Sequence, residues 1–368
     1  MTETERPEDA PRRRSDAVEQ AVAGSEALAP PRPTREEGAR AGEPRRVGVE
    51  IECVALDVAR GAELVQAHFG GSIRQEDPYR FVIEGAKHGD FTVELDTKYA
   101  HPSPRWDSVD VEGEWLADLV GLLRDLDRGA SELIGRVSED FVPMEIVSPP
   151  IPWDDLGSLS PLYRSIRDAG ATGTDEGALY ALGLHLNPEV AELESGWIAA
   201  VLRAYMMTSA WLRRSIDIDL TRRLLPYIDP FPRSYAKRVV DPGYAPNMTT
   251  LIDDYLAENA TRNRELDMLP IFAEVEEARV RRAVKDDRIS ARPAFHYRLP
   301  NTRFTEAEDG PVAEWNRWVL VERLAADRAV AEEMAAAYLD HYDALVPSDW
   351  TGEDWAEKSE RFLRRLIG

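Results

Sequence analysis

The sequence predicts an α+β fold built around a mainly antiparallel sheet, and two patterns indicate it. Several short segments alternate between apolar and polar residues, as strands with one buried face do. Longer segments repeat apolar residues at helical spacing and predict amphipathic helices. The expected strands span residues 47–53, 79–84, 90–96, 141–147, 178–187 and 295–299. The expected helices span residues 61–69, 111–137, 158–168, 195–216 and 250–257, and then most of the chain from 312 onward, including 334–342 and 350–366.

The first strand contains the most informative motif, Gly48-Val49-Glu50-Ile51-Glu52. Because side chains in a strand alternate between faces, Glu50 and Glu52 share one face and the apolar residues share the other. Two neighbouring carboxylates repel each other, and a divalent cation between them would relieve that repulsion, since hard cations take oxygen ligands. The motif therefore predicts either a solvated outer face or a metal site.

The later strands repeat this division into an apolar and a polar face. Their polar faces carry Glu94 and Asp96, then Glu145, then His185 and Asn187, and finally His296 and Arg298. An antiparallel sheet with one face in water is a common explanation for any one of these strands. Taken together, the faces hold acids, imidazoles and an arginine without lysine. If the strands form one sheet, they predict a common basin for divalent metal and a negatively charged group.

Composition excludes several classes of protein. The 368 residues carry a formal net charge of −23 and a single cysteine, Cys53. So acidic a chain would repel phosphate, which argues against nucleic acid or an anionic membrane as a partner. One cysteine excludes an intramolecular disulfide and a multi-cysteine metal site, and it fits a reducing cytoplasm. No segment has the roughly twenty continuous apolar residues that span a bilayer.

The chain divides into three expected parts. Residues 1–44 are rich in proline and alternating charge and have no apolar core, which predicts a disordered arm rather than a secretory signal. Residues 45–326 form the expected catalytic domain, and 327–368 a helical extension packed on it. Within that domain the proline-rich stretch 224–247 is expected to be irregular. Arg262 and Arg264 predict either a grip for an anionic group or a surface turn.

These motifs resemble those of the putative amidoligase family, carboxylate-amine ligases that share the glutamine synthetase and glutamate-cysteine ligase fold. The resemblance rests on four elements in family order and covers roughly residues 45–322. They are residues 48–52, 145–150, 183–187, and 295–300 with Arg303. The resemblance implies a sheet with helices packed on one face and an active-site funnel on the other.

The resemblance also implies a chemistry: an ATP-dependent ligase that joins a small-molecule or peptide carboxylate to an amine through an acyl phosphate, with Mg²⁺ or Mn²⁺. The strand pattern and the resemblance together give the expected metal ligands Glu50, Glu52, Glu94, Asp96, Glu145, His185 and His296. Nucleotide binding is expected from Glu145, His185, Asn187 and Arg298, and catalysis from Arg298, Arg303 and His185. The chain departs from the family pattern at Asn187, where a second histidine is usual, and at His296, where a glutamate is usual. Relatives of the fold often form rings or dimers, so a homo-oligomer is also expected.

Two other functions remain open at this stage. The acids with His185 and His296 also suit a metal-dependent hydrolase, although the sequence has no closely spaced histidine pair of the kind many such sites use. The departures at Asn187 and His296 also suit a relative that binds nucleotide or metal without turnover. ADP formation that an amine stimulates would distinguish the ligase from both.

Overall fold

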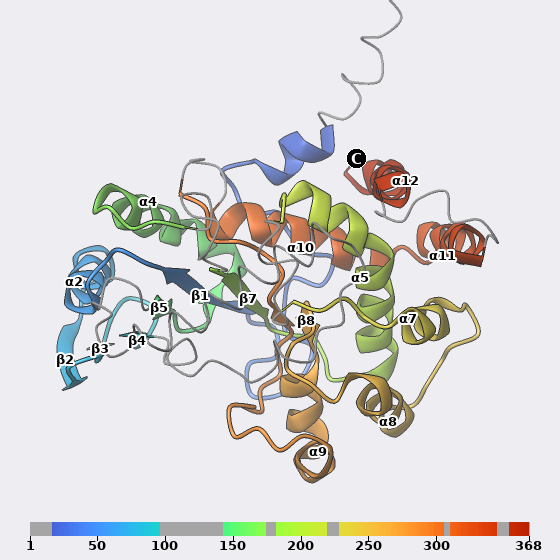
Figure 1. The fold of residues 1–368 in the computed structure, drawn as a ribbon, viewed down its shortest axis with the longest axis horizontal. Coiled ribbons are helices and arrows are strands. Elements are labelled where there is room, and N and C mark those ends of the chain that lie inside the picture. The colour runs from blue at the N-terminus through green and yellow to red at the C-terminus, as the bar shows by residue number, and fades with distance from the viewer. Residues whose placement is uncertain are drawn as a thin grey trace, which may run out of the picture.

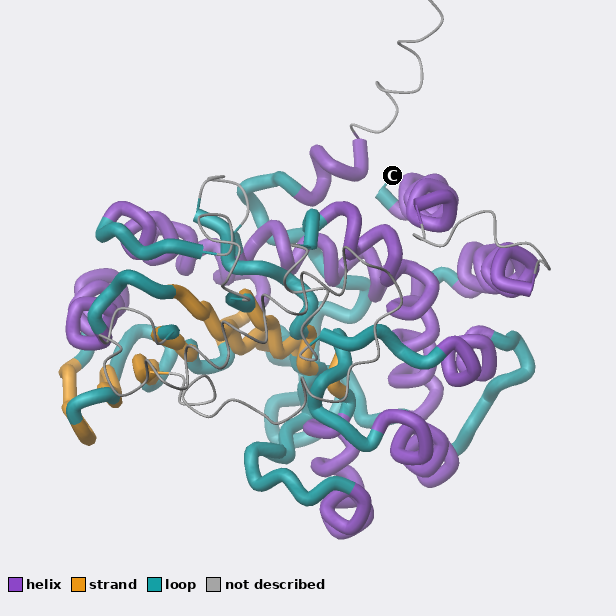
Figure 2. The backbone as a smooth tube through the Cα atoms, viewed as in Figure 1, coloured by secondary structure: helices purple, strands orange, loops and turns teal. Residues whose placement is uncertain are grey.

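The computed structural model describes residues 17–95, 143–173, 182–218, 228–304, 310–343 and 353–367. Among these residues the strands form one nine-stranded sheet, and its strands pair antiparallel. Figures 1 and 2 show the sheet crossing the middle of the molecule with helices around it. The prediction of an α+β protein with an antiparallel sheet is confirmed.

The strands run in the order β2-β3-β4-β5-β1-β7-β9-β8, with β6 beside β1. They are β1 (Arg46–Cys53), β2 (Ser72–Asp77), β3 (Arg80–Glu84), β4 (Phe91–Leu95), β5 (Met144–Val147), β6 (Ile151–Pro152), β7 (Leu184–Pro188), β8 (Leu266–Asp267) and β9 (His296–Tyr297). The sequence pattern did not predict β2, because this strand is mostly exposed and has no apolar alternation. The last predicted strand shortens to two residues, and the one before it begins at Leu184.

The central strand β1 separates the core from the polar face. Its apolar residues Val47, Val49, Ile51 and Cys53 are at most 1 % exposed. Burial, together with the charge of Glu52, raises the pKa of the Cys53 thiol to about 12, so this cysteine is a neutral core residue. The expected alternation therefore holds along β1, with the glutamates opposite the core.

Helices cover the apolar side and one end of the sheet. They are α2 (Val58–Phe69), α4 (Leu159–Asp168), α5 (Ser195–Ser215), α7 (Arg233–Val240), α8 (Met248–Asn259), α9 (Leu269–Ala283), α10 (Pro311–Ala326), α11 (Arg328–Asp343) and α12 (Glu353–Leu363), with the 3-10 segments η4 (Trp153–Ser158) and η6 (Arg364–Leu366). Helix α2 lies close to the sheet because it has a glycine there: a Cβ on Gly61 would come 2.6 Å from Sδ of Met144. Helix α10 packs Trp318 on the rings of Phe295 and Tyr297, at centroid distances of 5.1 and 5.5 Å.

A buried ion pair fixes the start of β1 to α10. Arg45 and Glu322 are both fully buried, and Nη1 of Arg45 lies 2.9 Å from Oε1 of Glu322. Arg45 also donates to the carbonyl of Glu189, and Trp318 donates to Glu322, at 2.7 and 2.8 Å. Removing one partner of such a pair leaves an unpaired buried charge, which typically costs about 3–5 kcal/mol.

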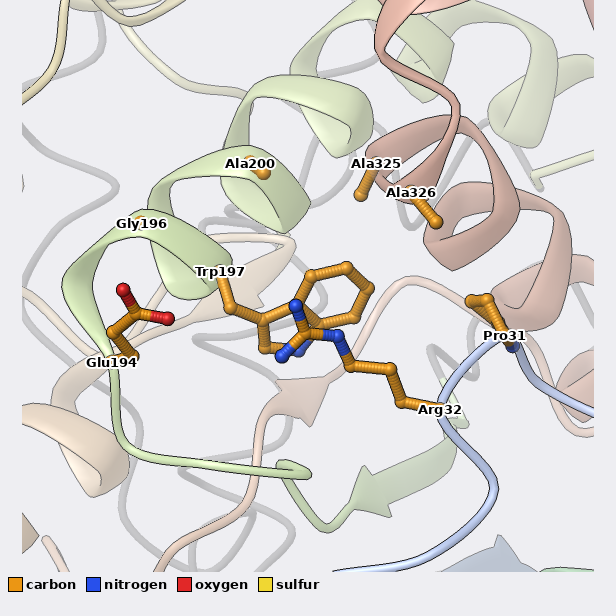
Figure 3. Close-up of a pocket in the computed structure, with 8 residues that line it drawn as sticks. All are labelled: Pro31, Arg32, Glu194, Gly196, Trp197, Ala200, Ala325 and Ala326. Carbon is orange, nitrogen blue, oxygen red and sulfur yellow. The ribbon is translucent and has the colours of Figure 1, made fainter. Parts of the chain in front are cut away.

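Residues 17–44 differ from the disordered arm that composition predicted. Val18 and Val22 are buried, and the amide of Asn316 on α10 binds this segment, accepting from the Leu28 N–H at 2.7 Å. The guanidinium of Arg32 lies 4.3 Å from the ring centre of Trp197 on α5. Here Pro31, Arg32, Trp197 and Ala326 line a cavity of about 440 Å³ that contains none of the predicted site residues (Figure 3). Composition missed this packing because a few apolar side chains, one cation–π contact and individual polar contacts such as those of Asn316 carry it.

The remaining helices compare with the sequence predictions as follows. Helix α7 lies inside the stretch 224–247, which was expected to be irregular, and α9 was not expected at all. Helix α12 packs on α5, where the indole N–H of Trp355 donates to the Met207 carbonyl at 2.8 Å. The expected helix at 111–137 and the acid Asp96 lie outside the described residues. No helix in the described parts of the chain has both the length and the hydropathy to cross a membrane.

Candidate functional site

Strand pairing lines up three carboxylates across the polar face. Glu145 on β5 lies in register with Glu52 on β1 and with Glu94 on β4. Glu52 is 4 % exposed and Glu145 is 7 % exposed, so neither faces open water as an ordinary outer-face acid would. The expectation that Glu52 and Glu145 simply lie on a solvated face is therefore wrong for these two.

A second set of polar groups lies next to this row, where β1 pairs with β7. Glu50 is in register with His185, and its Oε2 lies 3.1 Å from Nδ1 of that ring. The other oxygen of Glu50 accepts from Nδ2 of Asn187 at 2.9 Å, and Asn187 in turn accepts from Arg292 at 2.7 Å. Burial alone would raise the pKa of Glu50, but the hydrogen bond with His185 helps to hold it well below its usual range. Glu50 is thus a fixed, ionised carboxylate.

Gly183 makes room for His185. The backbone N–H of Gly183 donates to Oε2 of Glu52 at 2.7 Å. A Cβ added at Gly183 would lie 2.2 Å from Nε2 of His185, far inside van der Waals contact. The glycine of the motif therefore leaves room for the imidazole that lies near both Glu50 and Glu52.

His296 joins the site from β9, more than a hundred residues later in the chain. Its Nε2 lies 3.8 Å from Oε2 of Glu50, and its Nδ1 lies 3.5 Å from Oδ2 of the fully buried Asp267. The ring is 3 % exposed, and neither of its nitrogens has a hydrogen-bond partner among the described residues. Burial lowers the pKa of His296 to about 4, so the ring is neutral at pH 7, and neutral imidazole is the form that binds metals.

These side chains form two groups that can each hold a cation. Glu50, His185 and His296 form one, and Glu52, Glu145 and His185 form the other; in each group one ligand atom per residue lies within 4.8 Å of the others. His185 belongs to both and lies between them. The sequence predicted all five of these residues as metal ligands, and the structure brings them together.

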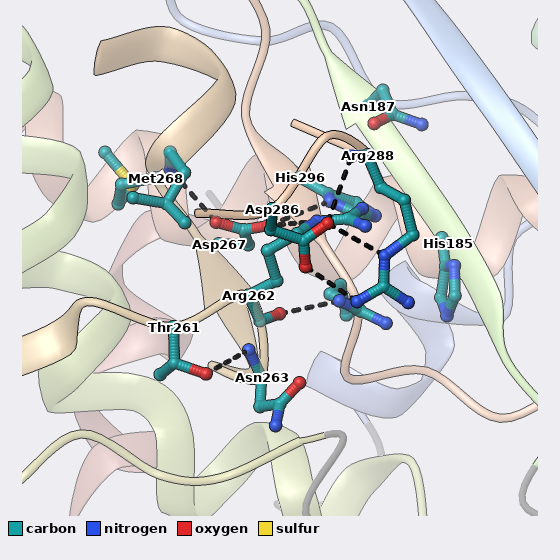
Figure 4. A network of polar contacts seen from close by, with 12 residues as sticks. His185, Asn187, Thr261, Arg262, Asn263, Asp267, Met268, Asp286, Arg288 and His296 are labelled. Carbon is teal, nitrogen blue, oxygen red and sulfur yellow. Dashed lines mark hydrogen bonds and ion pairs between the residues drawn. The ribbon is translucent and has the colours of Figure 1, made fainter. Parts of the chain in front are cut away.

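Arginines approach the same place from one segment of the chain. Figure 4 draws Arg262 and Arg288, which pair with Asp267 and Asp286, in the same close-up as His185 and His296. Arg298 is 9 % exposed and donates from Nη1 to the Arg262 carbonyl at 2.6 Å. Arg292, which binds Asn187, adds a fourth positive charge. The polar face thus has an acidic part suited to cations and a basic part suited to an anion.

The cation groups found among the described residues do not include three of the predicted site residues, Glu94, Arg303 and Asp96. Arg80 forms an ion pair with Glu94, whose side chain is 28 % exposed and which belongs to neither cation group. Arg303 donates to both the carbonyl and the carboxylate of Asp217, at 2.9 Å each. Asp96 is outside the described residues. The catalytic role expected for Arg303 remains a prediction.

The turn at 261–267 is half-buried at its arginines and buried from Glu265 onward, and Arg262 lies 3.8 Å from Asp267, a pairing that the surface-turn interpretation included. Glu265 and Asp267 are 1 % and 0 % exposed, and Arg213 pairs with Glu265 at 2.5 Å. Arg264 donates to the Pro230 carbonyl at 2.6 Å, so only Arg262 of the two arginines reaches the site.

Sequence reasoning missed four residues at or near the site: Asp267 and Arg292, which contact predicted site residues, and Asp286 and Arg288, which pair with each other. Arg288 binds Asp286 through two contacts, at 2.9 and 2.6 Å, which lower the pKa of that acid to about 2. These residues lie in turns and in a two-residue strand, where no periodicity marks them. The only signal was the density of arginine and aspartate before the His296 motif.

The comparison with known families agrees with this arrangement. A family model described as "Putative amidoligase enzyme" matches residues 43–320. The chain belongs to this family. The match contains both cation groups and the four arginines, and it confirms the resemblance that the strand motifs indicated. No curated protein and no solved structure matches the chain.

Proposed function

We propose that this amidoligase-family protein is an ATP-dependent carboxylate-amine ligase and that the polar face of its sheet is the floor of an active-site funnel of the glutamine synthetase type. One observation carries the proposal: buried carboxylates and histidines lie beside a group of arginines on the same face. A nucleotide phosphate with its metal ions needs both kinds of group at once.

The residues fit bound divalent ions. Nearly buried carboxylates in register, with a histidine that lacks hydrogen-bond partners, make a costly arrangement unless a cation joins them. Glu52 and Glu145 would hold one ion, and Glu50 with the histidines would hold another. Such ions, as Mg²⁺ or Mn²⁺, would neutralise phosphate charge and so allow an anionic carboxylate to approach.

The chain's own groups can do the remaining work. A carboxylate is a poor electrophile, and its conversion to an acyl phosphate by ATP makes attack by an amine feasible in water. Arg298 and Arg292 can stabilise the negative charge on the transferred phosphoryl group, because guanidinium groups form paired bonds to phosphate oxygens. Asn187 holds both Glu50 and Arg292, so it fixes an acidic and a basic group relative to each other.

A metal-dependent hydrolase is a second candidate, and one observation favours it. Two histidines and one glutamate are also the ligand set of several hydrolytic zinc sites. The absence of closely spaced histidines in the sequence does not count against it, since His185 and His296 meet through strand pairing, with ring centres 5.6 Å apart. Arg292 and Arg298 favour the ligase, because a water-activating metal site has no need of guanidinium groups beside it.

ADP formation tests the two candidates. The full chain is incubated with ATP, Mg²⁺ or Mn²⁺, and a panel of carboxylates, with and without amines. The ligase predicts ADP formation that depends on both substrates, and hydroxylamine added as the amine should trap the acyl phosphate as a hydroxamate. Hydrolysis of amide or ester substrates without ATP, and no amine-stimulated ADP formation, would contradict the proposal and support the hydrolase.

A further inference from the structure

The two cation groups differ in the chemistry of their ligands. The group of Glu52, Glu145 and His185 offers two carboxylates and one imidazole, so it is the richer in oxygen, which suits Mg²⁺. The group of Glu50, His185 and His296 offers two imidazole nitrogens and one carboxylate, a set that favours transition metals over Mg²⁺. We propose that Glu50, His185 and His296 form a site for a transition-metal ion, and that His296 makes this site discriminate against Mg²⁺.

The distances are already close to those of a metal site. Two ligands about 2.1 Å from one ion can lie at most about 4.2 Å apart. Oε2 of Glu50 lies 3.1 Å from Nδ1 of His185 and 3.8 Å from Nε2 of His296, so both pairs meet this limit. The ligand atoms of the two histidines lie within 4.8 Å of each other, so the rings must approach each other slightly for all three residues to bind one ion.

The outer contacts prepare the ligands for that ion. Asn187 binds Oε1 of Glu50, which leaves Oε2 directed at the two rings. Asp267 faces Nδ1 of His296 at 3.5 Å, which favours a proton on Nδ1 and leaves the lone pair on Nε2 toward Glu50. A carboxylate behind a ligand histidine is the usual way to fix its orientation and tautomer.

The buried ring of His296 is the independent sign that a ligand belongs here. Nδ1 of His296 faces only the Asp267 carboxylate, at 3.5 Å, and Nε2 has no hydrogen-bond partner within the described part of the chain; the ring is 3 % exposed. A buried polar group without a partner is costly, and binding a metal through Nε2 would satisfy it. A glutamate at the same position would give an oxygen-rich site with one more negative charge, better suited to Mg²⁺.

The inference deepens the proposed function and rests on it only in assigning Mg²⁺ to Glu52 and Glu145. Its test uses Co²⁺ alone, because the visible absorption of Co²⁺ reports on nitrogen ligands and coordination geometry. The metal-free full chain is titrated with Co²⁺, and Mg²⁺ is then added in about hundredfold excess. We expect the wild-type spectrum to persist in Mg²⁺.

Three variants and a control decide the outcome. Loss of an outer-shell partner typically weakens metal binding about 10–100-fold, so His296→Gln, which removes a ligand, should weaken Co²⁺ binding by at least that factor. His296→Glu should bind a cation that Mg²⁺ displaces. Glu52→Gln, in the other group, should keep the wild-type cobalt spectrum. His88→Gln is the control, since His88 lies outside both groups and contacts Ser158.

Thermal unfolding of each variant shows whether it is folded, and His296→Gln keeps a neutral side chain if His296→Glu proves unstable. Co²⁺ binding by folded His296→Gln that equals wild type would overturn the inference, and so would displacement of wild-type Co²⁺ by Mg²⁺. These binding results need neither ATP nor substrate. If Co²⁺ binding depends on His296 but the protein has no ligase activity, only the proposed function is refuted. If the protein has ligase activity but Co²⁺ binding does not depend on His296, only the inference is refuted.

Discussion

Gly183→Ala should impair the site without removing any of its ligands. The new methyl group would lie 2.2 Å from Nε2 of His185, whereas ordinary contacts begin at 3.4 Å, so the ring must move by about 1.2 Å. A misplacement of about 1 Å in a catalytic group can cost about a hundredfold in rate. Because His185 belongs to both cation groups, we expect metal affinity and turnover to fall together.

The assay for Gly183→Ala combines Co²⁺ titration of the metal-free protein with ADP formation under the conditions above. Gly157→Ala is the matched control, since a methyl group there would meet no atom within 4 Å. Both variants should unfold within a few degrees of wild type. Co²⁺ affinity of Gly183→Ala within twofold of wild type would refute the reasoning, because it would mean that the position of His185 does not matter to the site.

Three further predictions address catalysis and stability. Glu52→Gln should abolish metal-dependent ADP formation, while circular dichroism shows that the variant is still folded. Glu84→Gln, at an exposed strand end, should keep wild-type ADP formation. Full activity of Glu52→Gln would show that Glu52 is not part of the site. Glu322→Gln should lower the free energy of unfolding in urea by about 3–5 kcal/mol, against less than about 1 kcal/mol for the exposed Glu332→Gln; equal effects would contradict the importance of burial. His296, whose pKa is lowered to about 4, should make metal-free protein less stable as pH falls from about 6.5 to 4, because the unfolded chain takes up a proton that the folded one does not. This loss amounts to about 3 kcal/mol, and urea unfolding of His296→Gln should lack it.

The sequence predicted the floor of the site well because that floor follows from strand geometry. Alternation places Glu50 and Glu52 on one face of β1 whatever the rest of the chain does. The same rule places Glu145 and His185 on the polar faces of their own strands. Pairing of these strands around β1 then brings the residues together, and the apolar face supplies the core.

The parts that the sequence did not predict depend on contacts rather than on periodicity. Asp267 and Arg292 lie in irregular or very short segments, where neither a helical nor a two-residue repeat marks the buried side. Residues 17–44 have a composition typical of disorder, yet Asn316 satisfies several of their backbone groups from α10. Composition measures average hydrophobicity and cannot reveal one well-placed amide.

The position of β1 explains how one strand can serve two cation groups. Strand β1 lies between β5 and β7, so Glu52 meets Glu145 on one side while Glu50 meets His185 on the other. The two glutamates are two residues apart and therefore share a face, but Glu52 is in register with Glu145 of β5 and Glu50 with His185 of β7. Changing the residue at 296 alters the ligands of one group only, because His296 belongs to the group of Glu50 and His185 and not to that of Glu52, Glu145 and His185. The topology therefore allows the ligands of one group to change without disturbing the carboxylate pair of the other.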